Sequence, residues 1–155
     1  MELSGDELAG IVDQFGALSP ESLRQAIYET AFRAGADPEE ATVAAWIEAA
    51  REDFSLVTVE IEGETVYVPG PRAFPAVPEA ASDLTHVLDA SHRQVPDEAL
   101  AAGGHERLEA AAAETEDPTR AQELLDLTYD AEAWADLDLA GLRDRLGDVA
   151  TEGES

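Results

Sequence analysis

The chain has 155 residues, enough for one domain or two very small ones, with 35 acidic and 9 basic side chains and a formal net charge of −26. It has no cysteine, which excludes disulfides, thiolate catalysis and cysteine-ligated zinc or iron–sulfur centres. No apolar run approaches the roughly 18 residues of a transmembrane helix, and the N-terminus lacks the basic and apolar stretches of a secretory signal, so a cytoplasmic protein is expected.

Three amphipathic helices are predicted in the first third of the chain, each opened by a capping signal. Ser4 and Glu7 form a capping box for the first helix. Ser19 precedes the second, and Asp37 is expected to cap the third. Apolar residues follow the caps at helical spacing, namely Leu8, Ile11 and Phe15, then Leu23 and Ile27, then Val43, Trp46 and Ile47.

The apolar period then changes from 3.6 to 2 residues, which predicts two strands, 56–61 and 65–68, joined by a turn at Glu62-Gly63. This register gives the ribbon one polar face and one valine face. The valine face consists of Val57, Val59, Val66 and Val68. Because a two-stranded ribbon is marginal alone in water, we expect the valine face to pack against helices. The expected partner is Ile11, Ile27 or Ile47.

The remaining chain is predicted to be helical apart from a Pro-containing connection over 73–96, which carries a short helix and is a domain boundary or an arm over the first module. A C-terminal helical region is expected over 97–150, with its first helix interrupted at Gly103-Gly104, and a disordered tail over 151–155. The predicted fold class is mainly α with one small antiparallel β-ribbon.

Three helices followed by a ribbon over 1–72 resemble a winged helix-turn-helix in element order, which would imply DNA binding through the third helix. That helix and its flanks carry six acidic residues, however, and Arg51 as the one basic side chain. Because nucleic-acid affinity depends on Lys and Arg contacts with phosphates, Arg51 is the one DNA-binding candidate and a poor one. We expect a non-enzymatic interaction module of a halophilic cytosol that binds protein rather than DNA, with a link to gene regulation as one option. A winged-helix DNA-binding regulator is the alternative.

Chemistry-bearing clusters are sparse. His86, His92, Asp83 and Asp89 could share a helical surface as metal ligands, but acidic neighbours of any residue are common in this chain. His105-Glu106 lacks the second histidine of a zincin motif, and no phosphate-binding glycine loop or G-x-S-x-G is present. No catalytic residue, cofactor or metal is therefore expected. A small enzyme or metal-dependent protein with no recognisable motif remains the second alternative.

Three stretches carry a family likeness: LAGIVDQFGAL at 8–18, VPGPRAFP at 68–75 and TYDAEAWA at 128–135. They resemble small uncharacterised proteins of halophilic archaea. The resemblance implies a cytoplasmic haloarchaeal protein with a domain of unknown function and brings no activity with it. The acidic side chains are spread over the whole chain, as expected for a surface adapted to molar salt, where the Debye length falls to about 3 Å.

Overall fold

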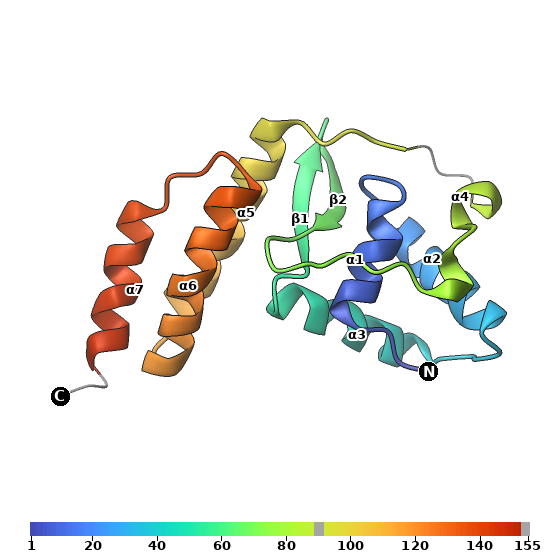
Figure 1. Ribbon diagram of the computed structural model, residues 1–155, viewed down its shortest axis with the longest axis horizontal. Coiled ribbons are helices and arrows are strands. Elements are labelled where there is room, and N and C mark those ends of the chain that lie inside the picture. The colour runs from blue at the N-terminus through green and yellow to red at the C-terminus, as the bar shows by residue number, and fades with distance from the viewer. Residues whose placement is uncertain (89–91, 153–155) are drawn as a thin grey trace. The chain divides into compact units, whose positions relative to one another are not determined.

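The computed structural model describes residues 1–88 and 92–152, and the chain divides into two compact units, Met1–Pro96 and Asp97–Ser155. The N-terminal unit contains α1 (Gly5–Asp13), α2 (Pro20–Arg33), α3 (Glu40–Glu52), β1 (Leu56–Ile61), β2 (Glu64–Pro69), the 3-10 helix η1 (Glu79–Ala81) and α4 (Leu84–Val87) (Figure 1). The C-terminal unit contains α5 (Asp97–Glu114), α6 (Pro118–Trp134) and α7 (Ala140–Glu152). The predicted fold class is confirmed, since the described residues are mainly helical with one two-stranded antiparallel sheet.

The first two helices begin where the sequence predicts. Ser4 Oγ accepts a hydrogen bond from the amide of Glu7 at 3.2 Å, and the Glu7 carboxylate accepts one from the amide of Ser4 at 3.1 Å. Ser19 Oγ accepts a hydrogen bond from the amide of Ser22, in the first turn of α2, at 3.1 Å. The predicted cap of α3 is wrong: its N-cap is Glu39, with no side-chain capping bond. The chain enters this helix two residues after Asp37, so that carboxylate is displaced from the first free amides.

The ribbon forms in the predicted register. Glu62 and Gly63 have φ values of 53° and 82°, which suits a tight hairpin turn whose twist matches the strands. Val57 pairs with Val68 and Val59 with Val66, and all four are buried.

The expected packing partners of the valine face need correction. The core cluster that contains Ile11, Ile27 and Ile47 takes up Leu56, with Tyr67 packed against it. Leu56 and Tyr67 belong to the opposite face of the ribbon, since side chains alternate along a strand. Both faces are therefore apolar at the base of the ribbon, which the expected division into one apolar and one wet face did not allow for.

Leu18, in the segment between α1 and α2, forms a short β-bridge with Tyr67 of the ribbon. The amide of Leu18 donates to the Tyr67 carbonyl at 3.1 Å, and the amide of Tyr67 donates to the Leu18 carbonyl at 2.7 Å. This antiparallel pair ties the segment before α2 to β2 and so fixes the ribbon against the helices.

The Pro-containing stretch is an arm that returns over α1. The amides of Phe74 and Ala76 donate to the side-chain and backbone oxygens of Asp6, each at 3.0 Å. A Cβ atom on Gly10 would lie 2.4 Å from the Ala76 backbone, so the close approach of arm and helix requires glycine at this position. Farther along, the amide of Arg93 donates to the Phe15 carbonyl at 2.8 Å.

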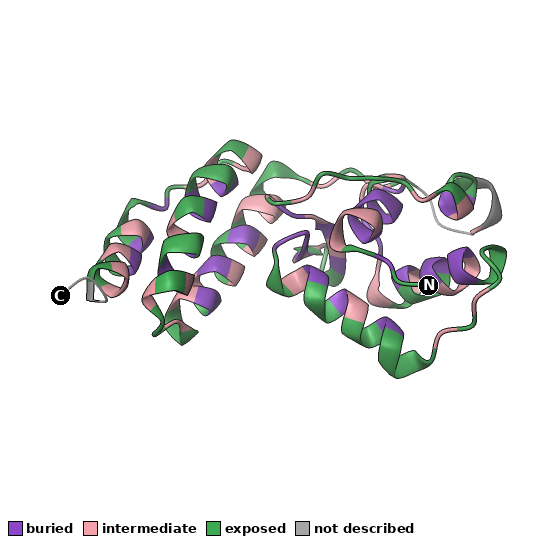
Figure 2. Ribbon diagram, turned by 60° about the horizontal axis from the view of Figure 1, so that its bottom comes forward, coloured by how far each residue is buried: buried purple, intermediate pink, exposed green. Residues whose placement is uncertain are grey.

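In the C-terminal unit, the expected interruption of α5 at Gly103-Gly104 is wrong. The helix is continuous from Asp97 to Glu114. Gly104 lies against the Trp134 ring, where a Cβ atom would come within 2.5 Å of the indole. Glycine here supplies space for packing rather than a helix break. Figure 2 shows buried and exposed positions alternating along these helices. The buried stripe of α7 and the residue before it comprises Leu139, Leu142 and Leu146. Helix α7 extends through Glu152, two residues into the predicted tail.

Candidate functional site

The exposed surface of α3 is acidic, and its other side chains are small. Its exposed positions are carboxylates, alanines and one threonine, namely Glu40, Ala41, Thr42, Ala44, Ala45, Glu48, Ala49 and Glu52. The Arg51 guanidinium is half-buried and lies 3.3 Å from the Glu48 carboxylate, which shares its charge. Trp46 packs against the core cluster of the unit. The carboxylates along this surface would repel the phosphate groups of a nucleic acid.

The predicted metal cluster is not assembled by the described residues. Asp83 and His92 are both exposed, whereas Asp89 and the side chain of His86 lie outside the part of the chain that the structure describes. Within that part, no three His, Asp or Glu side chains come together as metal ligands.

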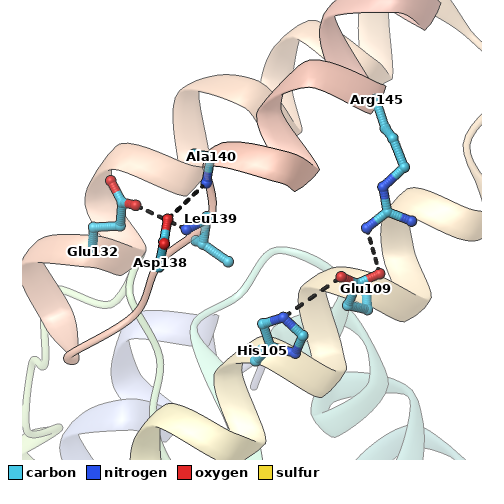
Figure 3. Close-up of polar contacts among 7 residues, drawn as sticks. All are labelled: His105, Glu109, Glu132, Asp138, Leu139, Ala140 and Arg145. Atoms are coloured by element: carbon cyan, nitrogen blue, oxygen red, sulfur yellow. Dashed lines mark hydrogen bonds and ion pairs between the residues drawn. The ribbon is translucent and has the colours of Figure 1, made fainter.

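His105 takes part in an ion-pair cluster rather than in a zincin site (Figure 3). Its Nε2 atom lies 3.5 Å from Glu109 Oε1, and Arg145 Nη2 donates to Glu109 Oε2 at 2.6 Å. The hydrogen bond from Arg145 lowers the pKa of the Glu109 carboxyl, which stabilises its ionised form. The cluster ties α5 to α7.

A second polar cluster fixes the turn between α6 and α7. Arg143 Nη1 donates to Glu132 Oε1 at 2.7 Å, and Glu132 Oε2 accepts from the amide of Leu139 at 3.0 Å. The guanidinium carbon of Arg143 lies 4.7 Å from the centroid of the Tyr129 ring. Asp138 Oδ1 accepts a hydrogen bond from the amide of Ala140, the first residue of α7, at 3.2 Å (Figure 3). These contacts join the end of α6 to the start of α7.

The N-terminal unit carries a groove of about 780 Å³ beside α2. One wall is the helix face made by four residues at helical spacing: Gln25, Tyr28, Glu29 and Phe32. The other wall is the turn from Gly35 to Pro38, which leads into α3. Its volume lies within the range of small-ligand and side-chain pockets.

The turn that forms the second wall is fixed by backbone hydrogen bonds. Gly35, with φ of 77°, donates to the Phe32 carbonyl at 3.0 Å, and the amide of Ala36 donates to the Ala31 carbonyl at 2.8 Å. These two bonds constitute a Schellman motif, which satisfies the last carbonyls of α2. The groove is therefore formed by the helix end itself.

The groove combines aromatic surface with negative charge. The Phe32 side chain is 78% exposed, whereas Tyr28 is half-buried and packs against the core cluster. Glu29 pairs with Arg33 at 3.3 Å, and Arg33 also donates to a carbonyl of the arm. Asp37 is exposed on the opposite wall. An occupant would meet two rings and two carboxylates.

Residues 6–151 match the family described as "Family of unknown function (DUF7109)". The chain belongs to this family. The expected relationship to an uncharacterised family is thereby confirmed, whereas a haloarchaeal origin stays an expectation. No curated protein and no solved structure matches the chain. None of the helices in 1–88 and 92–152 combines the length and apolar character needed to span a membrane.

Sequence reasoning missed the groove, although one signal was available. Tyr28 and Phe32 stand four residues apart in α2, beside the stripe that contains Leu23 and Ile27. An aromatic pair off the apolar stripe of a helix indicates an exposed aromatic patch. The contribution of Asp37 could not be read in the same way, because its local pattern indicates a helix cap.

Proposed function

We propose that the chain is a non-enzymatic interaction module of a salt-rich cytosol that binds another protein through the groove beside α2. The observation that carries this proposal is the position of Phe32, which is 78% exposed within a preformed groove. Aromatic anchors seated in pockets dominate the energetics of many protein interfaces. The winged-helix element order supports a link with gene regulation.

Contact with protein is preferred to contact with DNA because of the charge on α3. Its exposed surface carries Glu40, Glu48 and Glu52, and Arg51 is already close to a carboxylate. Counterion release from DNA also contributes less to affinity as salt rises. These features support a winged module that uses another surface for binding.

Selective loss of a partner tests the proposal. The full chain is immobilised in molar KCl and exposed to lysate of the source cells, alongside Phe32→Ala and the matched control Phe74→Ala. Phe74 is 80% exposed but lies on the arm, so its removal costs the same ring without altering the groove. A protein retained by wild type and Phe74→Ala but lost from Phe32→Ala is expected. Identical capture by all three chains would contradict the proposal.

A winged-helix DNA-binding regulator is the second candidate, supported by the Leu18–Tyr67 bridge that joins the ribbon to the segment between α1 and α2. Fluorescence anisotropy with a mixed-sequence duplex in about 0.5 and 2 M KCl tests it, after circular dichroism has verified folding. Saturable binding below about a micromolar, weakened by Arg51→Ala, would place this candidate first. We expect no such binding.

A further inference from the structure

We propose that the groove beside α2 receives an arginine side chain from a basic segment of the partner protein. This inference rests on the proposed function, because it names the partner chemistry that the same groove recognises. It is carried by the composition of the two walls, by the rigidity of the turn and by the charge of the chain.

The aromatic wall suits a planar cation. Tyr28 and Phe32 are four residues apart, so their rings leave the helix on the same side. Guanidinium groups stack on aromatic rings and are attracted by them. They are also more weakly hydrated than ammonium groups, so they lose less on entering an aromatic groove. This favours arginine over lysine.

The acidic wall supplies the complementary charge. The Asp37 carboxylate is exposed and does not cap α3, whose N-cap is Glu39. It therefore stands at the groove as an acceptor, and a carboxylate can bind a guanidinium through two parallel hydrogen bonds. Glu29 adds negative charge across the groove, although it shares that charge with Arg33 at 3.3 Å.

The turn between the walls holds this arrangement before any partner arrives. The Schellman bonds from Gly35 and Ala36 fix the backbone that carries Asp37. Tyr28 is held by its packing against the core cluster. A preformed site loses little conformational freedom on binding, so the contacts contribute more fully to affinity.

The occupant is a basic partner rather than a second copy of this chain. The chain has 9 basic against 35 acidic side chains, so a second copy offers few arginines to an acidic groove, whereas a basic segment offers several. Molar salt screens long-range attraction but leaves contacts inside the groove, so recognition depends on the rings and the adjacent carboxylates. A phosphate-bearing ligand would meet Glu29 and Asp37 and be repelled.

Isothermal titration of the full chain in molar KCl tests the inference. The probe is an acetylated and amidated Gly-Ser peptide with a central Leu-Arg-Leu, compared with the same peptide carrying citrulline, a neutral isostere, in place of arginine. We expect the citrulline peptide to bind about tenfold more weakly. Phe32→Ala should weaken the arginine peptide about tenfold and Asp37→Asn about threefold, and Phe74→Ala should leave it unchanged.

Several outcomes would overturn the inference: no measurable binding of the arginine peptide, equal binding of the citrulline peptide, or equal losses in Phe32→Ala and Phe74→Ala. A dimer in sedimentation equilibrium that Phe32→Ala dissociates would show a second copy as the occupant and also overturn it. If the peptides bind alike but lysate capture still depends on Phe32, the arginine assignment fails and the proposed function stands. If capture does not depend on Phe32, the proposed function itself fails.

Discussion

Each of the two units of this chain is stabilised internally by a different kind of contact. In the N-terminal unit, large buried side chains such as Leu8 and Phe15 form the core, and backbone hydrogen bonds hold the arm on α1. In the C-terminal unit, leucines and alanines line the helices, and arginine–carboxylate pairs join α5 to α7 and α6 to α7. The first unit should therefore respond most to changes in volume, and the second to changes in protonation. The groove lies in the N-terminal unit, where backbone hydrogen bonds join segments that are distant in the sequence.

The largest expected effect is that of salt, which tests whether charge acts on both units alike. With a net charge of −26 spread over the whole sequence, self-repulsion opposes folding at low ionic strength. We expect the melting temperature to rise steeply between about 0.1 and 3 M KCl, where screening becomes nearly complete. Circular dichroism measures the melting, and hydrogen exchange resolved by unit shows where opening starts. A flat or falling melting temperature would contradict the interpretation of the acidic surface as salt adaptation.

A matched pair of glycine substitutions tests the contrast in sensitivity to volume. Gly10→Ala would place a Cβ atom 2.4 Å from the arm, so the arm must move, and we expect a loss of about 1–3 kcal/mol. Gly147→Ala in α7 meets nothing within 4 Å and should instead gain up to about 1 kcal/mol from helix propensity. Urea denaturation measures both. Equal effects would show that the arm does not pack on α1 as described.

The smallest expected effect concerns protonation in the C-terminal unit. The hydrogen bond from Arg143, followed by that from the Leu139 amide, lowers the pKa of Glu132 below its ordinary value of 4.5. Ionised Glu132 therefore stabilises the fold above pH 4.5, and this stabilisation is lost as the pH falls through the lowered pKa. Glu132→Gln should reduce stability above that range and make no difference in stronger acid.

The control for this titration is Glu123→Gln, which interrupts an exposed pair with Arg120 on a single helix. Thermal melts of the three chains across the same pH range give the comparison. A constant difference between wild type and Glu132→Gln at all pH values would show that the effect is steric rather than electrostatic.

Local signals in the sequence predicted local structure well. The Ser4–Glu7 box and the Glu62-Gly63 turn depend on residues that are neighbours along the chain, and both are confirmed. The Gly103-Gly104 break was wrong because the reason for Gly104 is Trp134, thirty residues away and on another helix. The Asp37 cap failed because the helix begins later than its strongest local signal.

The aromatic wall of the groove was also predictable from neighbouring residues, whereas its acidic wall was not. Tyr28 and Phe32 could be placed on one helix face from their spacing alone. Their meeting with Asp37 required the Schellman turn and the displaced start of α3, and no sequence pattern specified the latter.

We propose that this chain binds an arginine-bearing segment at the groove. The most direct test is a nuclear magnetic resonance titration of the full chain with the Leu-Arg-Leu peptide in molar KCl. We predict saturable shifts of backbone amides along α2 and the turn from Gly35 to Pro38, with unchanged amides in the C-terminal unit. The same shifts should be absent with the citrulline peptide. Shifts centred on α3 or on Asp97–Ser155, or no saturable shifts at all, would contradict the claim.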